Sequence, residues 1–423
     1  MNGTLAQVIQ FRTRSEGYGW VVMGFLWAVN LLIPLAAVSL GVMLPPMTEE
    51  LGISPIEAGL LGASWFLGSA LVSLPASIWL SRFSPKWVTF YSTFLAGILL
   101  LVQGWAPSFG VLLVARFVFV TVVVCRVQAE VLLVHQWFST ARVAVVMSLT
   151  IGIMSIGQLA AVGLIPVLMD VLSGWRNVYI GLGAGLLVGA ALWTWVGRER
   201  ARPTAPETER ARGASPLRVL RRYRFLWVLA AAPSGAALAW GALMTFWPTL
   251  ALDNLGLSLK AVGALMMLFP AGGIAASFLA GPLSNLAGRR KPFLWVPGLL
   301  LPPIYIALYT TEITVVAGIL LLVAGWNAMI WVPIIRTIPF DLHLSPRETA
   351  VATGLGMTVL PIVGALGPPI VGVIQEATGS LQVGLLSIVG FPLTLVVGGL
   401  LIPETSPRRR HRAAQSVAKH AVT

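Results

Sequence analysis

The sequence is poor in charge, because only 10% of its 423 residues are Asp, Glu, Lys or Arg, whereas 57% are hydrophobic. A soluble globular domain carries about 25% charged residues, so this composition argues against one. The single cysteine, Cys125, excludes an intramolecular disulfide and a metal site built from several cysteines. We interpret Cys125 as a small apolar residue within a helix.

The common signatures of enzymes are also missing. No phosphate-binding P-loop is present, which argues against direct coupling to ATP hydrolysis. Four histidines and one cysteine form no cluster with metal-ligand spacing, and no serine stands in the setting of a nucleophile elbow. We therefore expect a protein that is not an enzyme and holds no metal or other cofactor. The net charge of +13 follows membrane topology, so we expect no nucleic-acid partner.

Long apolar runs of about 20 residues dominate the chain, and this length crosses a lipid bilayer as an α-helix. A membrane β-barrel would show segments of about 10 residues with alternating polarity, which these runs lack. The first run is too long for the core of a signal peptide, so we interpret it as an uncleaved span. The sequence predicts an all-α polytopic membrane protein with twelve spans, at approximately 20–44, 56–80, 87–105, 109–134, 143–169, 178–196, 225–250, 261–284, 292–310, 313–335, 350–374 and 383–402.

One long polar stretch, residues 197–224, divides the spans into two sets of six and carries nine arginines and three glutamates. Loops rich in Lys and Arg lie on the cytoplasmic side. With both termini inside, 24 of the 28 Lys and Arg residues fall in cytoplasmic segments, and only Arg176 and Lys260 fall on the outer side. The remaining two, Arg116 and Arg126, lie within the fourth span. We predict a multi-pass protein of the cytoplasmic (inner) membrane, with an N-terminal tail (1–19), six-helix bundles (20–197 and 225–403), a linker (198–224) and a basic tail (404–423).

The two halves look like one unit used twice. The polar loop SRFSPK at 81–86 corresponds to NLAGRRK at 285–291, and the glycines and prolines of the fifth span have counterparts in the eleventh. Glycine allows close helix packing in lipid, and proline allows a helix to bend. We therefore assign gating roles to Gly157, Pro166, Gly367 and Pro368, in two halves that rock around a midplane site. The alternative is that membrane helices are simply rich in both residues.

Several motifs resemble the major facilitator superfamily of secondary transporters. GPLSNLAGRRKPF at 281–293 resembles its loop motif, and LLVARFVFV at 112–120 resembles its fourth-helix arginine motif. GWRNVYIGLG at 174–183 and LPPMTEELGIS at 44–54 also look similar to members. The resemblance covers essentially the whole chain and implies two pseudo-symmetric six-helix bundles that work by alternating access. The layout is similar to the branch that moves small anions and carboxylates.

The loop motif departs from the family pattern. The family usually has an aspartate where this sequence has Ser81 in the first half and Asn285 in the second, which puts the charge-relay role of that loop in doubt. We expect its basic residues to act as cytoplasmic anchors and helix-end clamps instead. The residues assigned to this loop motif are Arg82, Lys86, Gly281, Gly288, Arg289 and Arg290.

The fourth span carries the clearest ionisable residues within any span, namely Arg116, Arg126 and Glu130. Such residues are costly in lipid, so they usually face the bundle interior and have partners. At about 100° per residue the three share one face, and Arg126 and Glu130 form an i, i+4 pair. One interpretation makes an arginine the anchor of an anionic substrate and Glu130 the proton carrier. The other is a structural ion pair, with Arg116 serving helix packing.

Three further residues are candidates for the substrate site. The first span has no acidic residue from Trp20 to Met47, so Asn30 is its clearest polar residue. The resemblance implies that spans one, four, seven and ten line the cavity, which adds Trp240 and Asn327. We interpret His135, just past the fourth span, as an interfacial residue.

We predict a secondary active transporter that moves a small organic or inorganic anion by symport with protons or another coupling ion. Two buried arginines against one buried glutamate favour an anion. We expect it to act as a monomer in the lipid bilayer on a small-molecule substrate. Two alternatives stay open: an exporter of hydrophobic or cationic compounds, favoured by the tryptophans, and a non-transporting membrane receptor or assembly factor on the same fold.

Overall fold

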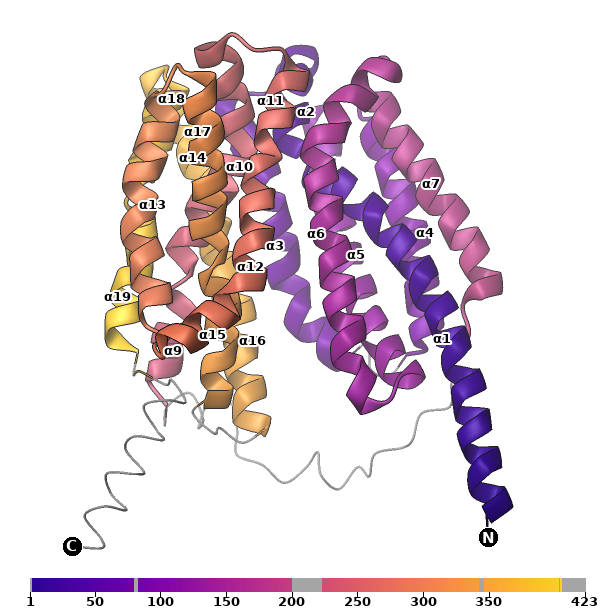
Figure 1. Ribbon diagram of the computed structural model, residues 1–423. Helices are drawn as coiled ribbons and strands as arrows, with labels where there is room; N and C mark the ends of the chain where they lie inside the picture. The colour runs from indigo at the N-terminus through magenta and orange to yellow at the C-terminus, as the bar shows by residue number, and fades with distance from the viewer. Residues whose placement is uncertain (1, 80–82, 200–222, 342–345, 403, 405–423) are drawn as a thin grey trace, which may run out of the picture. The chain divides into compact units, whose positions relative to one another are not determined.

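The computed structural model describes residues 2–79, 83–199, 223–341, 346–402 and Glu404, and within them it is built from helices without a β-strand (Figure 1). Twelve helical stretches are long and apolar enough to cross a membrane, which confirms the predicted fold class. The first half contains α1 (Asn2–Ala37), α2 (Leu40–Leu51), α3 (Pro55–Trp79), α4 (Pro85–Gly104), α5 (Phe109–Trp137), α6 (Thr140–Val171) and α7 (Trp175–Val196).

The second half has more and shorter helices, because several of its spans are interrupted. These are α9 (Phe225–Ala231), α10 (Ser234–Leu255), α11 (Leu259–Met266), α12 (Leu268–Ala287), α13 (Pro292–Thr310), α14 (Thr314–Met329), α15 (Trp331–Asp341), α16 (Pro346–Gly364), α17 (Gly367–Thr378), α18 (Leu381–Ser387), the 3₁₀ turn η3 (Phe391–Leu393) and α19 (Thr394–Leu401). Proline accounts for part of this pattern, since it cannot donate the helical hydrogen bond. Pro233 directly precedes α10, and α12 ends at Ala287, just before Gly288, whose φ of +63° suits glycine.

The chain divides into two compact units. The first unit is Met1–Ile53 with Leu67–Pro206, and the second is Ser54–Phe66 with Glu207–Thr423. The beginning of α3 therefore belongs to the second unit and its remainder to the first. The bundle, linker and tail boundaries predicted from the sequence stay a prediction, and most of the linker and the C-terminal tail lie outside the described residues.

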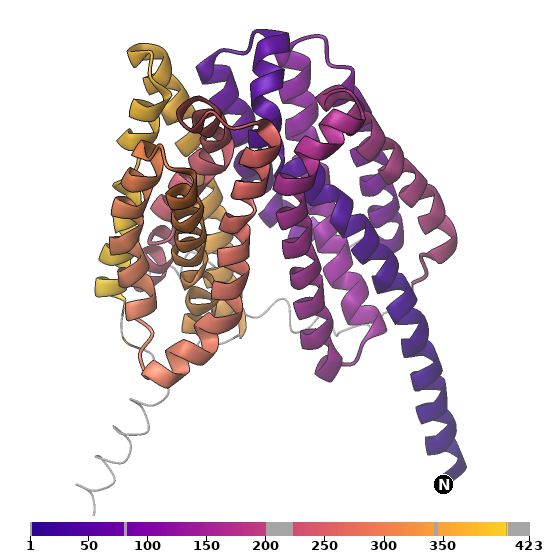
Figure 2. The ribbon, with the colours of Figure 1, turned by 45° about the horizontal axis from the view of Figure 1, so that its top comes forward.

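In the first unit, α4 packs against α5 and α7, and α1 packs along α6 (Figure 2). This unit contains a buried apolar cluster that includes Met23, Leu133, Trp137 and Trp193. Side chains also tie α7 to its neighbours there, since Nε1 of Trp193 donates to the carbonyl oxygen of Lys86 at 2.9 Å. The first unit thus holds α1, α4, α5, α6 and α7 in fixed contact around the charged residues of α5.

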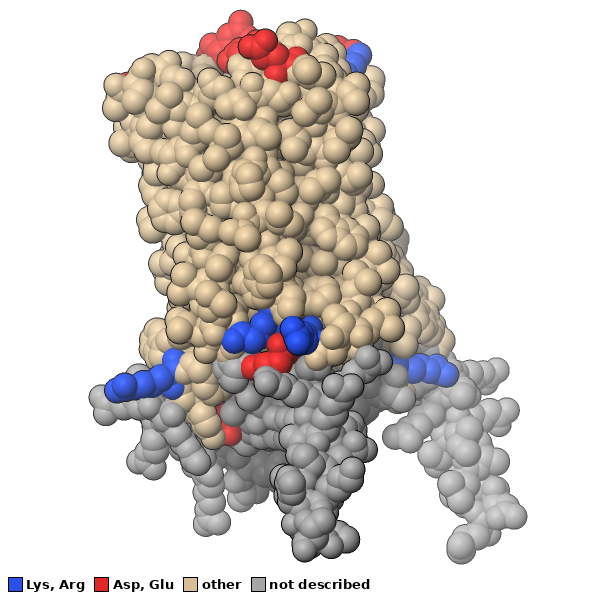
Figure 3. Space-filling view, turned by 60° about the vertical axis from the view of Figure 1, so that its left-hand side comes forward, with Lys and Arg blue, Asp and Glu red and all other residues tan. Residues whose placement is uncertain are grey.

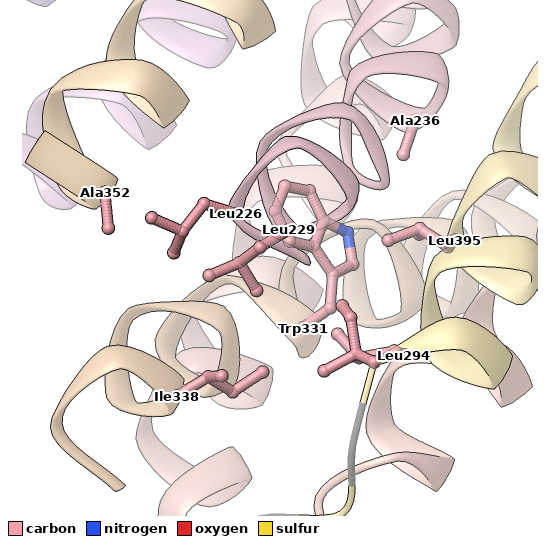
Figure 4. Close-up of a cluster of buried hydrophobic side chains, with 9 residues drawn as sticks. Leu226, Leu229, Ala236, Leu294, Trp331, Ile338, Ala352 and Leu395 are labelled. Carbon is pink, nitrogen blue, oxygen red and sulfur yellow. The ribbon is translucent and has the colours of Figure 1, made fainter. Parts of the chain in front are cut away.

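The core of the second unit is apolar. Figure 4 shows one cluster in which the indole of Trp331 lies among aliphatic side chains, including Leu229, Leu294 and Leu395. Trp331 begins α15, directly after the interruption of the tenth span at Ile330. Its Nε1 is buried and has no hydrogen-bond partner in the described part of the chain. Packing among apolar side chains, rather than hydrogen bonding, therefore holds this tryptophan.

The surface has the character expected of a protein in lipid. Large apolar side chains such as Trp195, Phe278 and Leu71 are exposed on the helices. On the face seen in Figure 3, acidic side chains gather at one end and most basic ones toward the other, with a wide band free of charge between them. Such a band matches the hydrocarbon part of a bilayer, whose core admits few charges.

Candidate functional site

Four charged side chains are buried in the described part of the chain, and α5 carries three of them. Arg116, Arg126 and Glu130 are 2%, 1% and 4% exposed, and the fourth is Arg290. The helix that bears them begins after Ser108 and runs unbroken to Trp137, so the spacing read from the sequence holds along its length. An uninterrupted helix fixes these charges at set depths within the first unit.

Asn30 of α1 lies between Arg126 and Glu130 and bonds to both. Its Nδ2 donates to Oε1 and Oε2 of Glu130 at 2.9 and 3.0 Å, and its Oδ1 accepts from Nη2 of Arg126. The direct approach of Arg126 Nη2 to Glu130 Oε2 is 3.6 Å, which is longer than a hydrogen bond. The pair predicted from the i, i+4 spacing therefore exists as a group of three, here called the Asn30–Arg126–Glu130 cluster.

Arg126 has N–H groups that make no hydrogen bond in the described residues. Its Nε and Nη1 are buried and have no hydrogen-bond partner in the described residues. A buried donor without a partner costs about 1–3 kcal/mol, and more when the group is charged. Arg126 thus presents unused N–H groups at a buried position, which is the property that an oxyanion-binding site needs.

Arg116 lies elsewhere along α5 and has different partners. Its Nη2 donates to the carbonyl oxygen of Ala37 at 2.8 Å, and its Nη1 lies 3.5 Å from that of Ala36 and 3.3 Å from the hydroxyl of Tyr179. Ala37 is the last residue of α1, where the carbonyl groups have lost their helical donors. The geometry makes Arg116 a cap on the end of α1, and its predicted role in substrate binding stays a prediction.

Trp240 and Asn327 belong to the second unit, and their contacts lie within it. The ring of Trp240 meets that of Phe66 edge to face, with centroids 5.8 Å apart. Nδ2 of Asn327 donates to the carbonyl oxygen of Val323 in its own helix at 2.9 Å. These contacts explain how the two side chains are held, and their assignment to a substrate site stays a prediction.

The two polar loops contain a feature that the sequence interpretation missed. Glu199, just after α7, binds the beginning of α4, accepting from the backbone N–H of Lys86 at 2.6 Å and from the hydroxyl of Ser84. Glu404, just after α19, does the same for α13, accepting from the backbone N–H groups of Arg290 at 2.7 Å and Lys291 at 3.3 Å. Each unit thus has a carboxylate at the N-terminus of its third span, although the aspartate of the loop motif is absent.

The other residues that were assigned to the loop motif and to gating differ in their burial and contacts. Arg82 lies outside the described residues. Arg290 is buried and bonds to Ser284, whereas Arg289 is exposed. A Cβ added to Gly281 would meet nothing within 4 Å, whereas one added to Gly367, which directly precedes Pro368, would run into the backbone of Leu238. Pro166 lies within α6 without interrupting it.

The described residues contain no group of three or more His, Cys, Asp or Glu side chains that could hold a metal ion. The chemistry available at the cluster is therefore that of a guanidinium, a carboxylate and an amide, which can bind an anion and carry a proton. A helical membrane protein of twelve spans with such a buried polar cluster has the architecture of a secondary transporter.

The chain belongs to the Major Facilitator Superfamily, whose family model matches residues 26–368 and 234–422. It is similar to a probable sulfoacetate transporter, SauU, of Cupriavidus necator, with 23% identity over 389 residues that cover 85% of this chain and 88% of that protein. It also resembles probable anion transporter 4, chloroplastic, of Oryza sativa subsp. japonica, at 26% identity over 176 residues, 41% of this chain and 30% of the rice protein.

Solved structures show the same fold. A bacterial homologue of the human lysosomal transporter Spinster, inward-facing and unoccupied, has a TM-score of 0.73 at 18% identity and covers 90% of this chain and 94% of its own. The nucleoside transporter NupG has a TM-score of 0.69 at 14% identity and covers 89% of this chain and 98% of its own. The protein is thus a multi-pass membrane transporter of this superfamily.

Proposed function

We propose that this transporter moves a small organic or inorganic anion across the cytoplasmic membrane by alternating access, coupled to protons. The observation that carries the proposal is Arg126, a buried guanidinium whose Nε and Nη1 have no partner in the described residues. An oxyanion with two or three oxygens, such as a carboxylate or sulfonate, supplies the acceptors that these donors need. The probable sulfoacetate and anion transporters similar to this chain support the same class of substrate.

Glu130 is the proton carrier in this proposal, and Asn30 connects it to Arg126. An ionised carboxylate only accepts hydrogen bonds, and both oxygens of Glu130 accept from the Asn30 amide. A proton on Glu130 turns one of these oxygens into a donor that faces the N–H groups of Asn30. The cluster then rearranges and releases Arg126 for the anion, so proton and anion bind together, as symport requires.

Few charged groups surround Glu130 in the described part of the chain. Arg126 is its charged neighbour within the described residues. The facing stretches of α1 (17–37) and α6 (145–169) contain no Asp, Glu, His, Lys or Arg, and the one charged residue of α4, Lys86, lies in its first turn. A change in the charge of Glu130 therefore acts mainly on Arg126.

The proposed orientation places both termini and the linker in the cytoplasm, because the basic residues concentrate in those segments. The proposal also includes transport of the anion, protons as the coupling ion and a monomeric state. Cysteine labelling from either side of the membrane, at introduced cysteines near Lys260 and near Arg289, tests the orientation. Labelling of position 260 from the cytoplasmic side would contradict it.

The proposal is tested first by binding. Purified protein is heated with sulfoacetate, acetate, sulfate or a lipophilic cation, because a ligand of the folded state raises its thermal stability. We expect an anion to stabilise the wild type and Arg336→Gln, which alters an exposed arginine of α15, but not Arg126→Gln. Stabilisation by the lipophilic cation alone would contradict the anion and favour an exporter of hydrophobic or cationic compounds.

Proton coupling is tested by transport in proteoliposomes. We expect an inward pH gradient to drive accumulation of the anion by the wild type, and Glu130→Gln to lose this dependence because glutamine cannot carry the proton. The variant should still exchange external for internal anion. Wild-type accumulation by Glu130→Gln would remove Glu130 from the mechanism.

A further inference from the structure

Two contacts fix α1 and α6 in register. Nε1 of Trp27 on α1 donates to Oγ1 of Thr150 on α6 at 2.9 Å. Seven residues further along both helices, Pro34 lies against Gly157. Equal intervals on the two helices mean that they run in parallel with a constant offset, and seven residues are about two helical turns. Asn30 lies between Trp27 and Pro34 in α1, so these two contacts set its position along the axis of α1 relative to α6.

The contact at Gly157 is close because the residue has no side chain. A Cβ placed there would lie 3.0 Å from Cγ and 3.3 Å from Cβ of Pro34, and 3.4 Å from the carbonyl oxygen of Asn30. The proline ring is rigid, so relief has to come from a shift of the helix backbone. Pro34 also lacks the N–H that would bind the Asn30 carbonyl within α1, and α6 approaches α1 at this carbonyl.

We propose that Gly157 is a positioning residue that, through Pro34, sets the place of the Asn30 amide between Arg126 and Glu130. The sequence interpretation gave Gly157 a gating role, whereas this role is the registration of a polar cluster. Its consequence for coupling rests on the proposed function, but the positioning itself does not. Hydrogen bonds of 2.9 and 3.0 Å leave the favourable range when lengthened by a few tenths of an ångström, so a small shift of α1 weakens them.

The test uses two glycines of one helix. Gly157→Ala is compared with Gly152→Ala, because a Cβ at Gly152 meets nothing within 4 Å. Each is made in the wild type and in Asn30→Val, and thermal stability is measured without any anion. If Gly157 positions Asn30, Gly157→Ala lowers stability in the wild type and much less in Asn30→Val, where no amide is left to misplace. Gly152→Ala should have the same small effect in both backgrounds.

An equal loss from Gly157→Ala in both backgrounds would overturn the inference, since the glycine would then serve packing alone. If Asn30→Val does not fold, Asn30→Ala replaces it as the background, because it also removes the amide. Rescue gives a second readout. Pro34→Ala removes the ring carbon nearest to position 157, so we expect it to restore part of the stability that Gly157→Ala loses, and an absence of rescue counts against the contact.

Binding of sulfoacetate extends the test to function. The affinity is compared at about pH 5.5 and about pH 7.5, where a proton-coupled site binds its anion more tightly at the lower pH. We expect Gly157→Ala to reduce the ratio of the two affinities by about threefold or more and Gly152→Ala to keep it. A wild type without any response to anions would contradict the proposed function and leave the stability comparison to decide the role of Gly157.

Discussion

The guanidinium of Arg116 donates from Nη2 to the carbonyl oxygen of Ala37, the last residue of α1, at 2.8 Å. A positive charge on the fourth span thereby caps the C-terminal end of the helix in the first span, where the helix dipole is negative. The second nitrogen is shared between Ala36 and Tyr179. Two arginines that look equivalent in the sequence therefore have different partners, and Arg126 alone belongs to the cluster.

Replacement of Arg116 separates a structural role from a binding role. We expect Arg116→Leu to lower the thermal stability without anion, because the buried oxygens of Ala36, Ala37 and Tyr179 lose their donor at a cost of about 1–3 kcal/mol each. The folded variant should still be stabilised by the anion. Wild-type stability combined with loss of the anion response would instead make Arg116 a binding residue.

Removal of the two charges of the cluster should be non-additive. Arg126→Gln or Glu130→Gln leaves one buried charge without compensation, and such a loss costs about 3–5 kcal/mol in buried pairs. The double variant carries no net charge at this position, so it should lose less stability than the two single losses together. Heating of all four proteins without anion measures this difference, and a sum of independent losses would show that the charges do not depend on each other.

Glu50 should give the first unit a dependence on acidic pH. Hydrogen bonds from Arg176, and to a lesser extent from Trp175, lower the pKa of Glu50 below its ordinary value of 4.5 despite the opposing effect of partial burial. A lowered pKa means that the stabilisation is complete above 4.5 and is lost as the pH falls through the folded-state value.

Glu50→Gln should therefore be less stable than the wild type at neutral pH, by about 1 kcal/mol at most because the pair is partly exposed. The difference should shrink as the pH falls below about 4.5, the ordinary pKa of the carboxyl group. Thermal unfolding at several pH values measures it. Glu49→Gln, at an exposed neighbour, is the control. A difference that stays constant with pH would show that the charge of Glu50 is not its cause.

The carboxylates of Glu199 and Glu404 should each stabilise a helix beginning. Alanine at position 199 leaves the backbone N–H of Lys86 in the first turn of α4 without this acceptor, and alanine at position 404 does the same for the N–H groups of Arg290 and Lys291 just before α13. The loss of such a helix cap costs roughly 1 kcal/mol. Glu312→Ala, at an exposed acid outside the caps, is the control. Thermal unfolding of the three variants gives the comparison, and three equal values would argue against the caps.

Fold and site were not equally accessible from the sequence. Run length and composition predict twelve spans because hydrophobicity alone decides which segments can enter a bilayer. The pairing of Arg126 with Glu130 follows from helical spacing. The bridge through Asn30 does not, since Asn30 lies 96 and 100 residues away in the chain and nothing local connects it to either partner.

For a similar reason, the sequence does not predict the partners of Arg116 or the capping roles of Glu199 and Glu404. A helix end binds whichever group the tertiary packing brings to it, and backbone carbonyl or N–H groups leave no trace in the residue types. One usable signal existed. Glu199 and Glu404 stand at matching places, just past the sixth and twelfth spans, and the comparison of the two halves could have paired them.

The position of Glu404 also decides where the chain can be cut or extended. The last helix within the described residues, α19, ends at Leu401, yet the residue that holds the beginning of α13 comes three positions later. A truncation or a fluorescent fusion placed directly at the end of α19 would remove or displace an acceptor on which the ninth span depends. A reporter joined beyond Glu404 keeps that acceptor, so Glu404, although it follows the last span, is part of the folded unit.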